Sequence, residues 1–314
     1  MKKLLLMITT VLTVLSGIVL AIPAAHAEDS KELAIVIPAA EHGWLAGVSY
    51  YAELKAKELG IENYRILTST NVNEQASQLD EVISQGVGGV VVLPHTDELS
   101  LAAKKVVDAK IPLVVFDRKV DADYTAYIAG SNPEIGKLSA ERIGEALEGK
   151  GTIAVLNNPS SGSVSTERVD AFKEVMKEKY PDIKMVDMTI NNFTQEEALR
   201  VATDTLVANP ELDAIFSIDD ESSLGILQAI KDANRTDIKI ISGAGGSQTY
   251  FNKIQEEKDI NLFTATYSPS MIGDAIEQAW KVMNDEEVEK DQIVPPTVVD
   301  KDNVKDMLDE KSPY

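Results

Sequence analysis

Short runs of valine, isoleucine and leucine recur along the chain and predict buried β-strands. Such runs are typical of parallel strands, because helices cover both faces of a parallel sheet. The runs with this pattern cover residues 33–37, 90–93, 113–116, 153–156, 214–218 and 238–241.

Amphipathic segments lie between these runs and predict helices. They cover residues 45–59, 72–84, 139–147, 168–179, 196–208 and 224–233, and a further helical pattern covers 271–284. Strands that alternate with helices of this length indicate right-handed β-α-β units. The predicted fold class is therefore α/β, with doubly wound parallel sheets that carry helices on both faces.

The pattern of strands and helices runs twice, over residues 33–130 and again over 152–266. We interpret the two passes as two similar lobes, separated by the segment around Gly130. The extended stretch at 293–299 follows the last helical segment and crosses back between the lobes in this interpretation. Repeated crossings of this kind would form a multi-strand hinge.

The first 27 residues have the pattern of a cleavable export signal. Two lysines precede an apolar stretch over residues 4–22, and the small-x-small sequence Ala25-His26-Ala27 follows. This order predicts secretion and cleavage after Ala27. The alternative is a membrane anchor, because the apolar stretch is nearly long enough to span a bilayer.

Composition narrows the classes of function. Removal of residues 1–27 takes away two lysines, so the formal charge changes from −21 to −23. This negative charge disfavours nucleic-acid or membrane-surface binding. The sequence has no cysteine, which excludes disulfides and thiolate metal sites. Only His42 and His95 remain after signal removal, which disfavours a histidine-rich metal centre, although carboxylates could still hold a hard cation. We predict no metal site and no cofactor.

Polar and aromatic side chains follow the predicted strands, where ligands of open α/β sheets bind. Carboxylates and guanidinium groups bind pairs of hydroxyl groups, and aromatic rings stack on the C–H faces of a sugar. The residues of this kind are His42, Trp44, Asp117, Arg118, Asn191, Asn192, Phe193, Asp219, Asp220 and Tyr267, with Arg168 near the start of a helix after the loop at 160–165. They predict a site for a polyhydroxylated ligand.

On these residues the chain resembles the ribose and galactose type of periplasmic sugar-binding protein, the soluble receptor of a bacterial ABC importer. The resemblance covers essentially the whole mature chain and implies two lobes that close on one ligand. The stretches that carry it are 34–44, 114–118, 167–172, 216–225 and 264–273. The implied domains are a signal peptide (1–27), an N-terminal lobe (28–130 and 268–295) and a C-terminal lobe (131–267 and 296–314).

The resemblance also assigns roles to individual residues. The family's polar contact and stacking aromatic in the first loop fall on His42 and Trp44, and its ligand-binding pair falls on Asp117 and Arg118. The remaining assignments are a second-lobe arginine at Arg168, a second-lobe stacking ring at Phe193, an aspartate at Asp219 where asparagine is common, and Tyr267 where glutamine is common.

The chain departs from the ribose-type pattern at two further positions. Leu45 stands where a second aromatic often stands, and Ala244 stands where the pattern has an aspartate. A hydrogen bond to a charged group is worth about 1.5–3 kcal/mol, so a moved carboxylate changes which hydroxyl arrangement is preferred. Our hypothesis is that Asp219 partly replaces the acceptor lost at Ala244, and that the ligand differs from ribose in its hydroxyl arrangement.

Structural roles compete with these assignments. His42 could instead cap its helix or bond a backbone carbonyl. One of Asp219 and Asp220 is expected to cap the helix that begins near Glu221, and we assign Asp219 to the ligand and Asp220 to structure. The glycine-rich run at 243–246 is interpreted as a structural turn.

The leading interpretation is a non-enzymatic, exported, monomeric binding protein of the periplasm. It would capture a monosaccharide or related polyol between two lobes and present the closed form to the membrane subunits of an ABC permease. One alternative is a sensory module that delivers its ligand state to a chemoreceptor or sensor kinase. Another is an exported carbohydrate enzyme, for which Asp117 and Asp219 would supply the pair of carboxylates.

Overall fold

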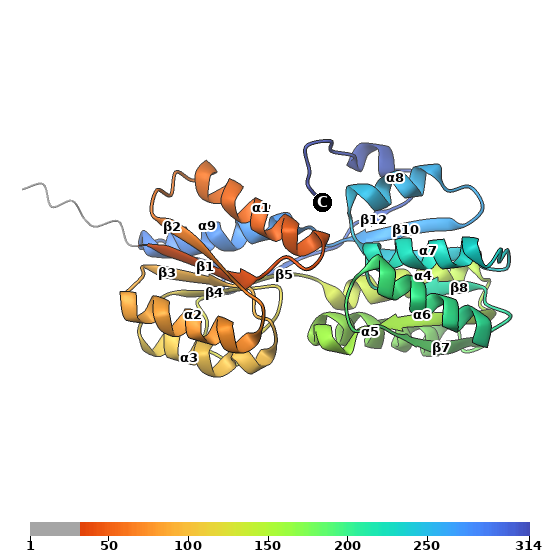
Figure 1. Cartoon of the computed structure of the whole chain (residues 1–314), viewed down its shortest axis with the longest axis horizontal. Helices are drawn as coiled ribbons and strands as arrows, with labels where there is room; N and C mark the ends of the chain where they lie inside the picture. Colours follow the sequence, from red (N-terminus) through yellow and green to blue (C-terminus); the bar gives the residue numbers. More distant parts are fainter. Residues whose placement is uncertain (1–31) are drawn as a thin grey trace, which may run out of the picture. The chain divides into compact units, whose positions relative to one another are not determined.

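The computed structural model describes residues 32–314, so the predicted export signal and its cleavage site lie outside the described residues. Within residues 32–314 the chain forms two six-stranded sheets, each with helices on both faces (Figure 1). We call them the N-lobe and the C-lobe. The predicted fold class, two doubly wound parallel-sheet lobes joined by a multi-strand hinge, is confirmed.

All strands of the N-lobe sheet run parallel, in the order β11-β5-β4-β3-β1-β2. Its strands are β1 (Leu33–Pro38), β2 (Tyr64–Ser69), β3 (Gly89–Val92), β4 (Leu113–Phe116), β5 (Ala126–Gly130) and β11 (Asp291–Val294). The central strands are fully buried, which accounts for their continuous apolar sequence.

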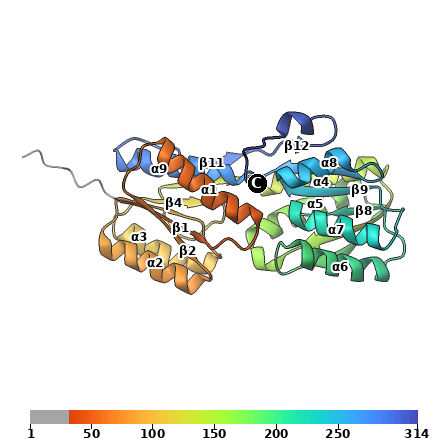
Figure 2. The same cartoon turned by 45° about the horizontal axis from the view of Figure 1, so that its top comes forward.

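Two helix pairs cover the two faces of this sheet. α1 (Gly43–Glu58) and α9 (Ile272–Met283) lie side by side on one face, and α2 (Val72–Gln85) and α3 (Ser100–Asp108) cover the other (Figure 2). Leu33, Ile35 and Ile37 of β1 face the first pair. Ala34 and Val36 face the second. This alternation follows from the two-residue repeat of a strand.

The C-lobe sheet has the order β12-β10-β9-β8-β6-β7 and is parallel except for β12, which pairs with β10 in the antiparallel sense. Its strands are β6 (Gly151–Asn157), β7 (Ile183–Thr189), β8 (Ala214–Phe216), β9 (Ile240–Gly245), β10 (Asn261–Thr266) and β12 (Val298–Val299). Its helices are α4 (Asn132–Ala146), α5 (Ser163–Lys179), α6 (Gln195–Ala208), α7 (Asp220–Asp232) and α8 (Gln248–Glu256). α4 packs against α5, and α6 packs against α7 (Figure 1).

The chain passes between the two sheets three times: after β5, after β10, and between β11 and β12. The last segment, with the short helix η4 (Val304–Met307), packs against α8 (Figure 2). The exact limits of the two lobes given in the sequence analysis stay a prediction. None of the helices described in residues 32–314 is long and apolar enough to cross a membrane.

The strands that the apolar pattern missed are one edge strand of each sheet, β2 and β7, and two buried strands, β5 and β10. β2 and β7 are the outermost strands of their sheets, and most of their residues are partly or fully exposed. An edge strand shows no continuous apolar run, so β2 and β7 were not visible in the hydrophobic pattern. The short helices α3 and α8 were also not predicted.

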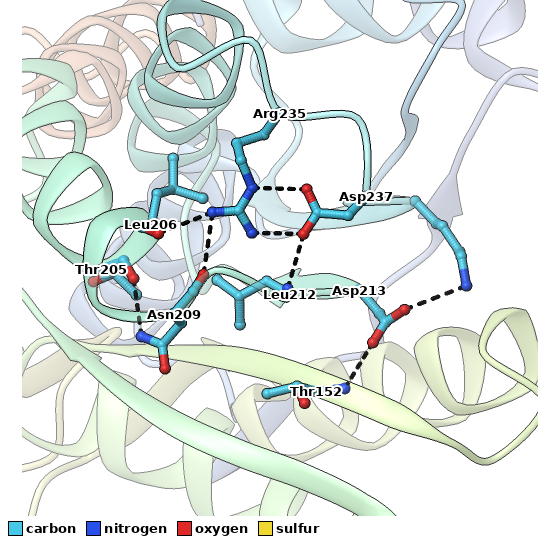
Figure 3. A network of polar contacts seen from close by, with 9 residues as sticks. Thr152, Thr205, Leu206, Asn209, Leu212, Asp213, Arg235 and Asp237 are labelled. Carbon is cyan, nitrogen blue, oxygen red and sulfur yellow. Dashed lines mark hydrogen bonds and ion pairs between the residues drawn. The ribbon is translucent and has the colours of Figure 1, made fainter.

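A network of hydrogen bonds lies at the end of the C-lobe where its strands begin, opposite the strand carboxyl termini (Figure 3). The guanidinium group of Arg235 donates two hydrogen bonds to the Asp237 carboxylate and two more to the carbonyl oxygens of Leu206 and Asn209, at the end of α6. Asp237 in turn accepts the backbone N–H of Leu212, ahead of β8. The network satisfies backbone groups that the helix end leaves unpaired.

Candidate functional site

All eight residues predicted to bind ligand line one cavity. Side chains of both lobes contribute to its wall. The lining residues are His42, Trp44, Asp117, Arg118, Val164, Arg168, Phe193, Asp219, Ala244, Gly245, Tyr267 and Tyr314. The structure therefore brings the predicted residues together, and their role in binding stays a prediction.

The position of the cavity follows from the two sheet topologies. In each sheet the strand order reverses beside a central strand, β1 in the N-lobe and β6 in the C-lobe. Loops at the carboxyl ends of the strands diverge at such a reversal and leave a crevice. Trp44 follows β1, Asp117 follows β4, and Asp219 follows β8, so all three reach the crevice from strand ends.

Asp117 adopts a left-handed backbone conformation, with φ 64°. Its N–H donates to the carbonyl of Ile128, and its own carbonyl accepts the hydroxyl of Tyr127 at 2.8 Å. A non-glycine residue keeps this conformation when its surroundings hold it, and residues held this way concentrate at ligand sites. The carboxylate accepts the Tyr267 hydroxyl at 2.5 Å and lies 3.6 Å from Nε of Arg118.

Arg118 is held by the N-lobe backbone. Its Nη1 donates to the carbonyl of His95 at 2.6 Å, and its Nε has no hydrogen-bond partner in the described part of the chain. The fixed guanidinium plane therefore presents one unsatisfied donor next to the Asp117 carboxylate. A ligand hydroxyl that accepts from Arg118 and donates to Asp117 would satisfy both groups.

Arg168 is a buried cation, 4% exposed, with neutral hydrogen-bond partners. Its Nε donates to Oδ1 of Asn132 at 2.8 Å and its Nη1 to the carbonyl of Ile218 at 2.6 Å. The guanidinium carbon lies 4.7 Å from the centre of the Tyr267 ring. The predicted start of its helix at residue 168 was wrong, because α5 begins at Ser163, inside the predicted loop. Arg168 therefore lies in the second turn of α5.

The assignment of a helix cap to one of the two aspartates is settled in favour of Asp219. Its Oδ1 accepts the N–H of Ser222 at 2.6 Å at the start of α7. Asp220 is held instead by the Thr264 hydroxyl and two backbone N–H groups, those of Gly246 and Ser247. Asp219 therefore combines a cap with a place on the cavity wall. The assignment of the cap to Asp220 was wrong, because Asp220 instead bonds Thr264, Gly246 and Ser247.

Burial changes the protonation of the two aspartates. Exclusion of solvent raises the pKa of Asp219 to about 7, and the negative charges of Asp220 and Glu221 act in the same direction. The hydrogen bond that Asp219 accepts from Ser222 acts in the opposite direction and lowers the pKa. Burial also raises the pKa of Asp220 to about 6, although the hydrogen bonds that Asp220 accepts and the charge of Arg168 lower it. At neutral pH the Asp219 carboxyl is therefore poised between its neutral and charged forms.

Aromatic rings form the apolar part of the wall. Trp44 stacks on Phe116 with 6.0 Å between ring centres and 9° between planes, and its Nε1 donates to the carbonyl of Tyr267 at 2.8 Å. Phe193 contacts His42 edge to face at 5.9 Å. The rings of Trp44 and Phe193 thus come from different lobes, as stacking on a sugar from two sides requires.

His42 occupies the N-cap position of α1 without a capping hydrogen bond from its side chain. Its Nδ1 is buried and has no partner in the described residues. Burial, with a smaller contribution from Arg118, lowers the pKa of His42 to about 4. The imidazole is therefore neutral at physiological pH, and neither structural role weighed for it is fulfilled.

The lobes touch directly beside the cavity. The N–H of Gly43, at the start of α1, donates to Oε1 of Glu221 in the C-lobe at 2.6 Å. Together with the His42–Phe193 contact, this bond gives a closed arrangement of the two lobes.

Four lining residues were not among the predicted ones: Val164, Ala244, Gly245 and Tyr314. Ala244 was noted only as a departure from the ribose-type pattern. The run at 243–246 was interpreted as a turn, but β9 continues to Gly245 and the turn begins at Gly246. Nothing in the local sequence of Tyr314 indicates a cavity residue, because long-range packing brings it there. Within residues 32–314, no cluster of histidine and carboxylate side chains is arranged to hold a metal ion.

Comparisons with known proteins agree with this arrangement. Residues 33–287 match the family described as the periplasmic binding protein domain. The xylitol-binding protein of Mycolicibacterium smegmatis is 29% identical over 254 residues, which cover 79% of this chain and 71% of that protein. The ribose import binding protein of Bacillus subtilis is 26% identical over 242 residues, covering 76% of this chain and 77% of that protein.

A solved structure has the same fold over nearly its whole length. It is an ABC transporter periplasmic solute binding protein from Actinobacillus succinogenes with bound D-allose. The TM-score is 0.80 at 25% identity, and the match covers 88% of this chain and 99% of that one. The resemblance noted in the sequence analysis is thereby confirmed.

Proposed function

The chain belongs to the periplasmic binding protein family, and on this basis we propose that it is the exported solute-binding component of an ABC importer. It captures one monosaccharide or related polyol between its lobes and presents the closed form to the membrane permease. It acts as a free monomer in the periplasm, without cofactor and without catalysis.

The observation that carries this proposal is the convergence of eight predicted side chains on one cavity between the lobes. The chemistry of the wall fits a hydroxylated ligand. Arg118 and Asp117 offer a neighbouring donor and acceptor, and the rings of Trp44 and Phe193 offer apolar faces. Arg168 offers a buried cation that has no carboxylate partner among residues 32–314. The ligands in the names of the relatives, xylitol, ribose and D-allose, belong to this chemical class.

Closure is the signal that the permease reads in this proposal. A ligand shifts an equilibrium between open and closed forms only by the difference of its affinities for the two forms. The cavity wall combines Asp117 and Arg118 of the N-lobe with Arg168 and Asp219 of the C-lobe. A ligand that contacts both pairs gains its full binding energy only in the closed form.

The arrangement of the carboxylates supports binding rather than catalysis. Asp117 already accepts a hydrogen bond from Tyr267, and Asp219 already caps α7. A glycosidase needs one carboxyl group free to protonate the leaving oxygen and a second free to attack or to activate water. Delivery of the ligand state to a chemoreceptor or sensor kinase stays an untested alternative, because the same cavity would serve it.

A thermal-shift panel of pentoses, hexoses, deoxy sugars and polyols tests the proposal. A ligand at 100 times its dissociation constant stabilises the folded state by about 2.7 kcal/mol, which raises Tm by about 5 °C or more for a chain of this size. Calorimetry on each compound that raises Tm then gives its Kd.

Two aspartate variants of the N-lobe distinguish the effect of a cavity carboxylate on binding from the effect of a surface carboxylate. Asp117→Asn is expected to weaken the cognate compound at least tenfold. Asp121→Asn, at an exposed ion pair with Lys104, is expected to leave its Kd unchanged. A wild-type protein that is stabilised by no member of the panel would refute the proposed function.

A further inference from the structure

The last segment of the chain lies beside the cavity, and its residue Tyr314 lines the cavity wall. After η4 the segment leaves α8 and reaches α1, so it spans from one lobe to the other. We call residues 308–314 the strap. The N–H of Asp309 donates to Oε1 of Gln248 in α8 at 2.8 Å, and Oγ of Ser312 lies 2.9 Å from Oη of Tyr51 in α1.

Glycines of both lobes make room for the Tyr314 ring. A Cβ atom at Gly47 would lie 3.2 Å from Cβ of Tyr314, and one at Gly43 would lie 3.5 Å from its Cδ2. On the C-lobe side, a Cβ atom at Gly245 would overlap the phenol oxygen. The ring is thus enclosed by the first turns of α1 and the end of β9, and it is 7% exposed.

The same geometry gives a reason for the departure from the ribose-type pattern. Ala244 and Gly245, which end β9, are small residues at the place where that pattern has an aspartate. An aspartate side chain would project from the end of β9, whereas the absence of a side chain at Gly245 leaves room for the phenol oxygen of Tyr314. The ring of Tyr314 is part of the cavity wall, and its phenol oxygen lies against the end of β9.

We propose that Tyr314 is a specificity-determining residue of the ligand site, carried there by the strap, and that its ring limits the length of the sugar or polyol that the closed protein accepts. This inference rests on the proposed function. Burial and the carboxylates of Asp220, Asp219 and Glu221 raise the pKa of Tyr314 well above its usual range, against the charge of Arg168, so its hydroxyl stays neutral. A neutral hydroxyl can both donate to and accept from a ligand hydroxyl.

Calorimetry with a series of linear polyols and aldoses of four to seven carbons tests the inference. The proteins compared are wild type, Tyr314→Ala, Tyr314→Phe and Tyr124→Phe. Tyr314→Ala is expected to weaken the best wild-type ligand at least tenfold and to move the preferred length up by one carbon or more. Tyr314→Phe is expected to keep the preferred length and to weaken binding about threefold to tenfold.

Tyr124→Phe is the matched control, because it removes an exposed tyrosine hydroxyl that donates to Asp291 and neither holds the strap nor lines the cavity. It is expected to leave the order of ligands unchanged. Thermal unfolding without ligand shows whether each variant is folded, and Tyr314→Phe keeps the test decisive if Tyr314→Ala is not. An unchanged order of ligands in Tyr314→Ala, or an unchanged Kd in Tyr314→Phe if only that variant folds, would overturn the role of Tyr314. A wild type that binds no member of the series would overturn the proposed function as well.

Discussion

The hydroxyl of Tyr267 donates a 2.5 Å hydrogen bond to Oδ1 of Asp117, a residue 150 positions earlier in the chain. Tyr267 follows β10 of the C-lobe, yet its ring packs in the N-lobe core with Ala265 and Met271. It also lies beneath the guanidinium group of Arg168. One tyrosine at a crossing between the lobes thus contacts the charged groups of both halves of the site.

Replacement of Tyr267 by phenylalanine removes this bond and keeps the ring. A hydrogen bond to a buried charged group is worth about 1.5–3 kcal/mol, so ligand affinity is expected to fall about tenfold to a hundredfold. Calorimetry measures the change. Tyr124→Phe removes an exposed hydroxyl that donates to Asp291, also a tyrosine-to-aspartate bond, and is expected to leave the Kd unchanged. Equal effects of the two variants would contradict a specific role of Tyr267.

The bond between Gly43 and Glu221 is expected to favour the closed form. Glu221→Ala removes the acceptor for the N–H of Gly43. One such bond contributes about 0.5–1.5 kcal/mol, so the Kd is expected to rise about threefold to tenfold. Small-angle scattering without ligand should show a larger radius of gyration than for the wild type. Glu196→Ala, at an exposed position at the start of α6, serves as the control and should change neither quantity.

Ligand affinity is expected to depend on pH through Asp219, whose pKa is raised to about 7. A ligand hydroxyl that donates to this carboxylate binds the charged form, so affinity falls as pH drops through the pKa. The Kd is expected to rise about tenfold between about pH 8 and about pH 6, and Asp219→Asn should flatten this dependence. Calorimetry across this range measures it, and a Kd of the wild type that is independent of pH would refute the role of Asp219.

Asp237 is expected to set part of the acid stability of the C-lobe. The hydrogen bonds from Arg235 lower its pKa from 3.8 to about 2, so the folded state binds fewer protons than the unfolded state in that range. The stabilisation is therefore complete above pH 3.8 and is lost as pH falls toward about 2. At neutral pH, Asp237→Ala should reduce the free energy of unfolding by about 1–2 kcal/mol.

Thermal unfolding of this variant at neutral pH and near pH 2 checks the prediction. The difference from the wild type should shrink at the lower pH. Asp204→Ala, which removes an exposed partner of Arg200, is the matched control and should be neutral at both pH values. A destabilisation of Asp237→Ala that is the same at both pH values would rule out the ion pair as its cause.

Tryptophan fluorescence offers a direct report on the cavity. The sequence has two tryptophans. Trp44 lines the cavity, and Trp280 of α9 packs against the N-lobe core. A cognate ligand is expected to change the emission of the Trp280→Phe variant and not that of Trp44→Phe. The reverse result would place the ligand elsewhere.

Apolar runs identified several buried strands but missed β5 and β10, which are also buried. β1 and β4 read as apolar runs because both of their faces are covered, and the residues after them, Trp44 and Asp117, could be found from the strand ends. The edge strands β2 and β7 and the choice of Asp219 as the helix cap were not predictable in this way. They depend on exposure and on which of two adjacent carboxylates a helix end selects. Tyr314 was missed because its neighbours are brought to it only by the completed fold.

The three passages between the lobes have a consequence for biosynthesis. α9 contributes Ile272, Ile276 and Ala279 to the core of the N-lobe, and β11 completes its sheet. An emerging polypeptide that lacks these late segments leaves the apolar surface beside α1 uncovered, even though the first five strands are already made. The N-lobe can therefore complete its core only after residues 272–294 have been synthesised, when most of the C-lobe is already made.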